Sequence, residues 1–215
     1  MSDIDRSAEL DRRRHWDEKY RNSGPGLVSW YQAAPTPSLE MIDALALAAD
    51  TPVLDVGGGA STLVDELLDR GFSDVSVLDV SDAAIDSVRQ RLGGREGFHG
   101  IVEDLLEWGP DRTYGLWHDR AVLHFFVDPV DRARYRDLLR RSVRPGGAVI
   151  IATFAPDGPT SCSGLPVKRW SSDEISEFLG EDFAVVESRR EDHVTPADRV
   201  QPFTWLAARR IEEGQ

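Results

Sequence analysis

Short apolar runs alternate with amphipathic segments over most of the chain. Brief runs rich in valine, isoleucine and phenylalanine are typical of buried strands, whereas apolar residues spaced three and four apart indicate helices. These patterns predict strands at Val53–Val56, Val75–Asp79, Phe98–Val102, Tyr114–His118, Ala148–Thr153, Phe183–Ser188 and Phe203–Arg209. Between them they predict helices at Ser61–Arg70, Asp82–Leu92, Pro129–Val143 and from Ser171, which has capping-box spacing to Glu174, to about Gly180.

This alternation of strands and helices is typical of a parallel sheet that is covered by helices on both faces. The sequence RPGG at Arg144–Gly147 predicts a helix stop and a turn before the fifth strand. The last two predicted strands are joined by a link that contains Pro196 and Pro202, and they fit an antiparallel hairpin. We therefore expect an α/β fold with a doubly wound, mostly parallel sheet that closes on a C-terminal antiparallel hairpin.

The N-terminal region has a different pattern. Helical spacing predicts a helix over Asp5–Tyr20 with apolar points at Leu10, Trp16 and Tyr20. The breaker NSGPG follows at Asn22–Gly26, and a second helix is predicted at about Pro37–Ala49. We expect residues 1–50 to form an N-terminal helical and aromatic segment, and residues 51–215 to form one α/β domain.

Acidic residues outnumber basic ones, and the net charge is −13 at pH 7. This charge repels phosphate groups, so nucleic acids and anionic membranes are not expected partners. The basic cluster Arg12–Arg14 lies among acids and is interpreted as a solvated helix face. No apolar run is long enough to span a bilayer, and the first residues are too polar for a signal-peptide core, so we expect a cytoplasmic protein.

The single cysteine, Cys162, excludes an intrachain disulfide and a cysteine-based zinc cluster. The histidines are scattered and none forms an H-x-x-x-H pair, so no metal site is expected. Cys162 lies in a predicted loop, and we interpret it as a buried or bystander thiol because nothing in the sequence indicates an activated one.

The most specific motif is VLDVGGGAST at Val53–Thr62, where a predicted strand runs into three glycines and a helix start. Such a turn lets the backbone approach a ligand closely, although a glycine-rich turn without a ligand is the simpler alternative. A dinucleotide site requires the spacing G-x-G-x-x-G, but the sixth position counted from Gly57 is Thr62. Asp55 is the more informative residue, because a carboxylate at the end of a buried strand needs a partner. The motif is similar to that of methyltransferases, in which such an acid is expected to anchor the loop and to lie near the ammonium group of the cofactor's methionine part.

Further acids close the next two predicted strands. Asp79 ends the second strand, where an acid is placed to accept both ribose hydroxyls of a nucleoside, and Val80 follows it as a candidate contact. Glu103 and Asp104 follow the third strand, where one carboxylate can take the exocyclic amine of adenine and Leu105 can flank the ring. Either acid alone is more often a surface residue. Together with the two preceding strand-end acids, they form a consistent set.

Residues 53–153 resemble a class I S-adenosylmethionine-dependent methyltransferase. The resemblance rests on Asp55, Gly57, Gly58 and Gly59 of the first motif, on Asp79 and Asp104, and on LRRSVRPGGAVII at Leu139–Ile151. It implies a seven-stranded sheet, S-adenosylmethionine as cofactor, S-adenosylhomocysteine as product, and direct methyl transfer. The segments HWDEKY, VSWYQ and APDGPTSCSGLPVKRWS resemble a bacterial branch of small methyltransferases related to the thiopurine and lysine methyltransferases. In that branch the aromatic N-terminal segment closes over the cofactor, which implies a helical lid that contains Trp16, Tyr20, Trp30 and Tyr31. For Trp16 and Tyr20, which have helical spacing, core packing is the alternative, whereas Trp30 and Tyr31 follow a breaker and are expected to contact the cofactor.

The acceptor is expected at the end of the fourth strand, in WHDRAVLHFF at Trp117–Phe126. Enzymes that methylate amino groups of DNA bases or glutamine carry an Asn/Asp-Pro-Pro-aromatic motif here, and this chain does not, which argues against a nucleic-acid substrate. His124 is the candidate general base, with a hydrogen-bonded structural histidine as the alternative. His118 is expected beside the cofactor, and Asp119 either lines the pocket as a catalytic residue or pairs with Arg120.

The leading hypothesis is methyl transfer to a nitrogen, oxygen or sulfur atom of a small molecule. Transfer to sulfur or to a neutral nitrogen needs no base, because the sulfonium is an activated donor and proximity supplies much of the rate. The alternatives are a protein lysine methyltransferase, which the acidic surface favours by attracting basic targets, an NAD-type oxidoreductase and a non-catalytic cofactor-binding module. The oxidoreductase is disfavoured by Asp55, Thr62 and the absence of a Tyr-x-x-x-Lys pair.

Overall fold

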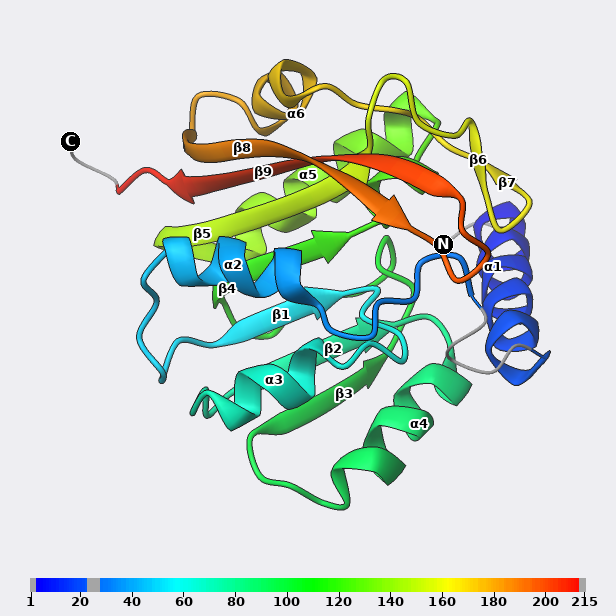
Figure 1. The fold of residues 1–215 in the computed structure, drawn as a ribbon, viewed down its shortest axis with the longest axis horizontal. Coiled ribbons are helices and arrows are strands. Elements are labelled where there is room, and N and C mark those ends of the chain that lie inside the picture. Colours follow the sequence, from blue (N-terminus) through cyan, green and yellow to red (C-terminus); the bar gives the residue numbers. More distant parts are fainter. Residues whose placement is uncertain (1–2, 23–27, 213–215) are drawn as a thin grey trace.

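A computed structural model describes residues 3–22 and 28–212, with side chains from residue 10 onward. This part of the chain forms one seven-stranded sheet in the order β3-β2-β1-β4-β5-β9-β8 and a separate two-stranded hairpin, β6-β7 (Figure 1). The strands are β1 (Val53–Val56), β2 (Val75–Asp79), β3 (Phe98–Val102), β4 (Tyr114–Arg120), β5 (Val143–Phe154), β6 (Ser161–Cys162), β7 (Leu165–Pro166), β8 (Phe183–Val194) and β9 (Val200–Arg210). The helices are α1 (Asp3–Asn22), α2 (Thr36–Ala44), α3 (Leu63–Asp69), α4 (Asp82–Leu92), α5 (Pro129–Ser142) and α6 (Ser172–Leu179), with a 3-10 turn, η2, at Leu123–Phe125.

The five strands from β1 to β5 pair in parallel, and β9 inserts antiparallel between β5 and β8. The predicted doubly wound sheet with a C-terminal antiparallel hairpin is therefore confirmed. Parallel strands of one sheet end at the same edge, so the four segments that follow β1 to β4 lie side by side.

Helices cover both faces of the sheet because side chains alternate along each strand. On β1, Val53 packs with α2, α3 and α4, whereas its neighbour Leu54 packs with α5 and α6 on the other face. Figure 1 shows α2 in front of the sheet and α5 behind it. Both residues are fully buried, as expected of a sheet that is covered on both sides.

Local signals fix several helix ends. The Ser81 hydroxyl accepts the Ala84 N–H at 3.3 Å to start α4, and Gly93 ends that helix with a φ of 60°. The capping box predicted for Ser171 and Glu174 is present at the start of α6, with both reciprocal hydrogen bonds formed.

Several predicted boundaries are wrong: β8 continues to Val194 instead of ending at Ser188, and Pro202, predicted in the link, lies within β9. Two further differences have a clear local cause. The helix predicted to reach Ala49 ends at Ala44, because Ala46 takes a left-handed φ of 48° and turns the chain toward β1. No glycine or proline marks that turn. The turn predicted at Arg144–Gly147 lies within β5, which begins at Val143 directly after α5; Val143 pairs with Tyr114, and the register shifts between Tyr114 and Leu116.

Helix α1 stands at the carboxyl edge of the sheet and contacts the start of α4 (Figure 1). Its Asp17 accepts the Ser81 hydroxyl at 2.6 Å, and Arg21 pairs with Asp82 at 3.2 Å, so α1 is attached to the segment after β2. The Arg12 Nε lies 2.6 Å from Asp104 after β3. The interpretation of Arg12 as part of a solvated face is therefore wrong, because its guanidinium faces a buried carboxylate across the edge of the sheet. The predicted breaker at Asn22–Gly26 lies outside the described residues, apart from Asn22.

The β6-β7 hairpin was not predicted, because its strands are too short to produce an alternating pattern. It places Cys162, which is buried, over the same edge of the sheet as α1 (Figure 1). Within residues 3–22 and 28–212, no helix combines the length and the apolar character needed to cross a membrane.

Candidate active site

The glycine loop follows β1 at the centre of the sheet edge. Gly57 and Gly59 have φ values of 60° and 53°, a region that residues with a Cβ rarely adopt. A Cβ on Gly58 would collide with the carboxylate of Asp55. The loop therefore requires glycine at all three positions for the backbone to fold tightly over the end of β1.

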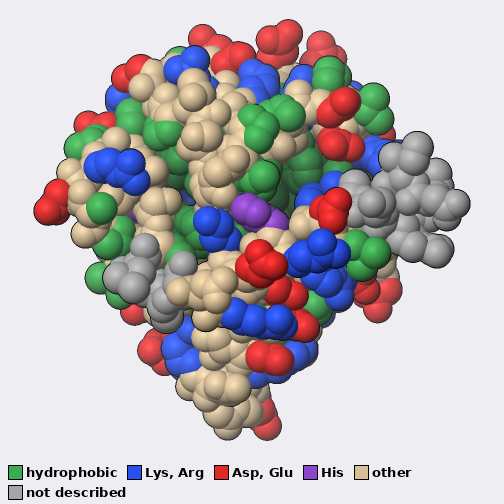
Figure 2. Space-filling model, turned by 90° about the vertical axis from the view of Figure 1, so that its right-hand side faces the viewer, with side chains coloured by type: hydrophobic (Ala, Val, Ile, Leu, Met, Phe, Trp, Pro, Cys, Tyr) green, Lys and Arg blue, Asp and Glu red, His purple; other side chains and the backbone are tan. Residues whose placement is uncertain are grey.

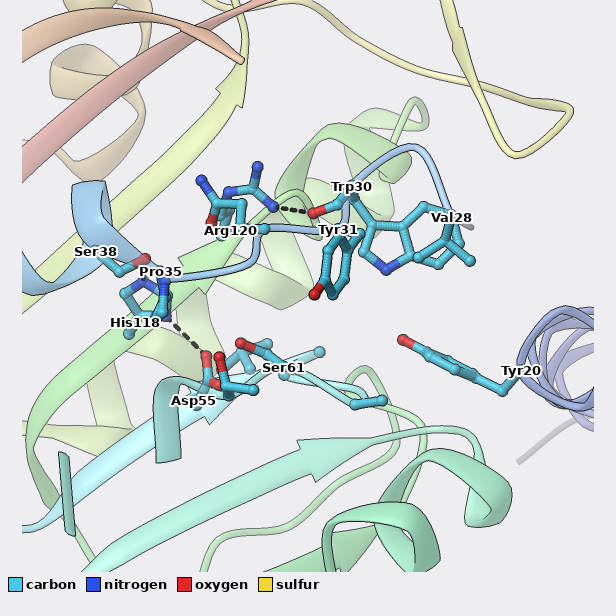
Figure 3. A pocket seen from close by; sticks show the side chains of 16 residues that line it. Tyr20, Val28, Trp30, Tyr31, Pro35, Ser38, Asp55, Ser61, His118 and Arg120 are labelled. Atoms are coloured by element: carbon cyan, nitrogen blue, oxygen red, sulfur yellow. Dashed lines mark hydrogen bonds and ion pairs between the residues drawn. The ribbon is translucent and has the colours of Figure 1, made fainter. Parts of the chain in front are cut away.

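Asp55 is buried at the end of β1 and is bonded to a histidine from the neighbouring strand. His118 Nδ1 lies 2.7 Å from Asp55 Oδ1, and its Nε2 lies 3.0 Å from the Ser38 hydroxyl on α2 (Figure 3). The register of β1 and β4 places Asp55 directly opposite His118. The hydrogen bond to His118 gives the buried carboxylate of Asp55 a partner, which offsets the cost of removing it from water.

Asp79 ends β2, and its Oδ1 accepts the Ser81 N–H at 2.8 Å. Burial raises the pKa of Asp79 to about 7, against the lowering effect of the backbone N–H groups of Ser81 and Gly59. The charge of Asp55 raises the pKa further. A carboxylate of this kind gains from a ligand that donates hydrogen bonds to it.

The acids that follow β3 differ in their surroundings. Asp104 is buried, with Oδ1 accepting the Leu106 N–H at 3.0 Å and Oδ2 facing Arg12. Glu103 is exposed, and Leu105 is buried beside both acids.

A cavity of about 290 Å³, here called the strand-end cavity, joins these groups. One side is acidic and polar, and the other is apolar. Its lining includes Arg12, Trp16, Trp30, Gly57, Asp79, Val80, Glu103, Asp104, Leu105, Arg120, Phe125, Cys162 and Leu165. Figure 2 looks onto this edge of the sheet, where hydrophobic side chains gather in a hollow between acidic and basic ones.

A second cavity of about 80 Å³, the glycine-loop cavity, lies beside the first. It is lined by Asp55, Gly57, Gly58, Ser61 and His118 on one side and by Tyr20, Trp30, Tyr31 and Arg120 on the other (Figure 3). Tyr20, Trp30, Val56, Gly57 and Arg120 line both cavities, so the two adjoin. Trp16 meets Trp30 and Phe125 edge-on, with ring centroids 5.7 and 5.2 Å apart, and closes the outer side. Between them the two cavities bring together all the residues predicted to bind the cofactor except Gly59, whose backbone N–H reaches Asp79.

Asp119, predicted as a catalytic residue or a partner of Arg120, has a different role in the structure. Its oxygens accept the N–H groups of Val122 and Leu123 at 2.8 and 3.0 Å and the hydroxyl of Tyr135 at 2.6 Å. Asp119 is fully buried and forms no ion pair with Arg120. It holds the chain in place as it leaves β4, and it lines neither cavity.

His124, predicted as the general base, is fully buried in η2 between Phe125 and Phe154, whose ring centroids lie 4.4 and 4.8 Å away. Neither ring nitrogen has a hydrogen-bond partner in the described residues. Burial, together with the charge of Arg120, lowers the pKa of His124 to about 3. A histidine with this pKa binds a proton too weakly to act as a base at neutral pH, so the base role has no support from this geometry.

Arg120 was considered only as a partner of Asp119, yet it lines both cavities. It ends β4, and its Nη1 donates to the Trp30 carbonyl at 3.0 Å (Figure 3). Burial lowers its pKa to about 10, so it remains a cation at neutral pH. In the sequence, Arg120 stands at the end of a predicted buried strand, as Asp55, Asp79 and Asp104 do. This shared position was the signal that Arg120 belongs to the same site.

The fold and this site resemble those of class I S-adenosylmethionine-dependent methyltransferases. Residues 53–147 match a family model described as a methyltransferase domain. The cofactor of this class is S-adenosylmethionine, and the resemblance noted from the motifs is confirmed.

Two curated relatives differ in the acceptor that their names give. A malonyl-[acyl-carrier protein] O-methyltransferase from Ilyobacter polytropus is 26% identical over 49% of this chain and 40% of its own length. An EEF1A lysine methyltransferase from Danio rerio is 24% identical over 83% of this chain and 78% of its own. The chain thus spans less than half the length of the first of these relatives.

Among solved structures, the fold is similar to that of 1,6-didemethyltoxoflavin-N1-methyltransferase from Burkholderia thailandensis, which holds 1,6-didemethyltoxoflavin and S-adenosylhomocysteine. The TM-score is 0.71 at 21% identity, over 99% of this chain and 92% of that one. At this identity the likeness establishes the fold alone.

Proposed function

We propose that this chain transfers the methyl group of S-adenosylmethionine to a small-molecule acceptor. Asp79 would accept the ribose hydroxyls, and Asp104 with Glu103 would receive the adenine amine beside Leu105 and Val80. The glycine loop, Asp55 and His118 would hold the amino-acid part. The chemistry that the cofactor supplies is an activated methyl group on a sulfonium.

The observation that carries this proposal is the composition of the strand-end cavity. Its acidic side holds hydrogen-bond acceptors at the ends of β2 and β3, and its apolar side is closed by Phe125, Cys162 and Leu165. A cavity with one polar and one apolar side suits a cofactor nucleoside with an acceptor next to it. The apolar side is covered by α1 and the β6-β7 hairpin, which favours an acceptor small enough to be enclosed.

The N-terminal segment, residues 1–50, would act as a lid. Trp16 on α1 and Trp30 in the following loop cover the side of the cavity that the sheet leaves open. Ion pairs from Arg12 and Arg21 hold α1 against the segments after β3 and β2. Closing this side excludes water from the sulfonium and completes the acceptor pocket.

A protein lysine methyltransferase is the second candidate, because one relative carries that name and covers most of the chain. A lysine acceptor must be neutral to react, and a cation such as Arg120 beside it would lower the pKa of the amine and favour that form. What favours the small molecule is the enclosure of the apolar side of the cavity, not the charge of Arg120.

Calorimetric titration tests the cofactor proposal. S-adenosylhomocysteine is expected to bind with a dissociation constant in the micromolar range, about −8 kcal/mol, and NAD is expected not to compete. Binding of NAD without binding of S-adenosylhomocysteine would contradict it. Release of S-adenosylhomocysteine in the presence of small thiols, phenols and amines, compared with a panel of lysine peptides, then separates the two candidates.

A further inference from the structure

The guanidinium of Arg120 is a buried cation with unused hydrogen-bond donors. Its Nε and Nη2 are buried and have no partner in the part of the chain that the structure describes, and only Nη1 is bonded, to the Trp30 carbonyl. A buried charge without a counter-charge is costly. An anionic ligand would remove that cost.

Carboxylates of the protein do not supply the missing counter-charge. Glu191 and Asp55 influence Arg120 through their charges, but neither forms an ion pair with it among the described residues. Glu191 accepts the Trp205 Nε1–H at 2.7 Å and the Gln32 amide at 3.3 Å, and Asp55 is bonded to His118.

The position of the guanidinium separates it from the acids assigned to the cofactor's nucleoside, although Arg120 also lines the glycine-loop cavity with Asp55 and His118. Its Cζ lies 4.9 Å from the centre of the Phe203 ring on β9, and its charge acts on the Cys162 thiol and on His124. These residues belong to the β5 and β9 side of the sheet edge. The acids assigned to the nucleoside follow β2 and β3, on the opposite side of the glycine loop.

We propose that Arg120 binds the acceptor as an anion, so that the substrate is a small acid whose reacting oxygen or sulfur is deprotonated: a phenol, a thiol or a carboxylic acid. This inference rests on the proposed methyl transfer. The acceptor loses its proton to solvent before or on binding, and its lone pair forms the new bond to the methyl carbon. The S–CH3 bond breaks, its electron pair stays on sulfur, and the sulfonium and the anion become a neutral thioether and a neutral methyl product.

This assignment also explains why no general base is needed. A cation about 4–6 Å from an acid lowers the acid's pKa by about 1–3 units, which delivers a phenol or thiol in its reactive form. The neutral product no longer pairs with Arg120 and is released. His124 lies near Arg120 but is buried and uncharged at neutral pH. It therefore supplies no negative charge to the guanidinium, which stays available for an anionic acceptor.

The test uses the full chain saturated with S-adenosylhomocysteine and 4-nitrophenol as the probe, since the phenolate is yellow and the phenol is colourless. Titration with pH at increasing protein concentration gives the pKa of the bound probe. In the wild type it is expected about 1–3 units below that of the free probe. Arg120→Met should abolish the shift, Arg120→Lys should keep part of it, and Arg190→Met, which removes an exposed arginine paired with Asp157, should leave it unchanged.

The outcomes separate this inference from the proposed function. If S-adenosylhomocysteine does not bind the wild type, the proposed function fails. If it binds but the probe shows no shift, or Arg120→Met keeps the full shift, the anion subsite is refuted. If Arg120→Met weakens S-adenosylhomocysteine tenfold or more while the probe shift persists, Arg120 is a ligand of the cofactor's carboxylate, and the inference is likewise wrong.

Discussion

Replacing Asp79 with asparagine should make the unliganded protein more stable and at the same time reduce its affinity for the cofactor. Asp79 is buried at the end of β2, where burial raises its pKa from the ordinary value of 3.8 to about 7. Asparagine keeps the size of the side chain and an oxygen that can accept the Ser81 N–H. It removes the charge and replaces the other acceptor oxygen with an amide NH2 group, so the gain in stability is smaller than the charge alone would give.

The pKa gives the magnitude and the pH range. The native state binds the Asp79 proton more tightly than the unfolded chain, so the free energy of unfolding falls as the pH rises from about 4 to about 7. A difference of about 3 pKa units corresponds to about 4 kcal/mol, an upper bound. At pH 8, Asp79→Asn should therefore unfold at a temperature up to roughly 8–16 °C above the wild type, with no gain at pH 4.

Thermal unfolding between pH 4 and pH 8, without and with S-adenosylhomocysteine, measures both effects. Two ribose hydrogen bonds to a charged acceptor contribute about 1.5–3 kcal/mol each, so the variant should bind S-adenosylhomocysteine about 100-fold or more weakly. Asp50→Asn, at an exposed turn before β1, is the matched control and should change neither quantity. Equal stability of Asp79→Asn and wild type at pH 8 would refute the reasoning on burial, and unchanged affinity would show that Asp79 is not the ribose ligand.

Three further substitutions test other parts of the site. Gly58→Ala should fold but lose S-adenosylhomocysteine binding in calorimetry, because the new Cβ collides with the Asp55 carboxylate; retained affinity would mean that the loop moves freely. Trp16→Ala removes three edge-on ring contacts, to His15, Trp30 and Phe125, worth about 0.5–1.5 kcal/mol each, so Tm should fall. Because Trp16 also closes the outer side of the strand-end cavity, the dissociation constant should rise about 10-fold; unchanged affinity would identify Trp16 as a packing residue only. Tyr135→Phe leaves Asp119 with one hydrogen bond fewer, so the free energy of unfolding in urea should fall by about 1–3 kcal/mol while the cofactor affinity stays the same. A loss of affinity without a loss of stability would instead indicate that Asp119 belongs to the binding site.

Much of the fold follows from local sequence patterns. The strands β1, β2 and β3 and the helix α4 begin and end at the residues that the sequence pattern predicts. Boundaries failed where the local signal was absent, as at the end of α2, or misleading, as at Arg144–Gly147. The end of α2 is set by the return of the chain toward β1, and the start of β5 is set by pairing with β4.

The cofactor side of the site was also present in the sequence. Strand ends of a parallel sheet meet at one edge, so the order of β1, β2 and β3 is enough to bring Asp55, Asp79 and Asp104 together once the strands are identified. The glycine requirement at Gly58 is local as well, because the colliding carboxylate lies only three residues earlier.

The roles of the residues after β4 were decided by tertiary structure. Asp119, Arg120 and His124 are separated by few residues. The sequence predicted a base at His124 and a pocket or pairing role for Asp119, and it considered Arg120 only as the partner of Asp119. The Asp119 carboxylate accepts hydrogen bonds from the Tyr135 hydroxyl and from backbone N–H groups, so it is not available to a ligand. Enclosure by Phe125 and Phe154 lowers the pKa of His124 and so removes its basicity. Arg120 alone faces the cavities, because hydrogen-bond partners and burial depend on neighbours that are far apart along the chain, and a sequence pattern does not specify those neighbours.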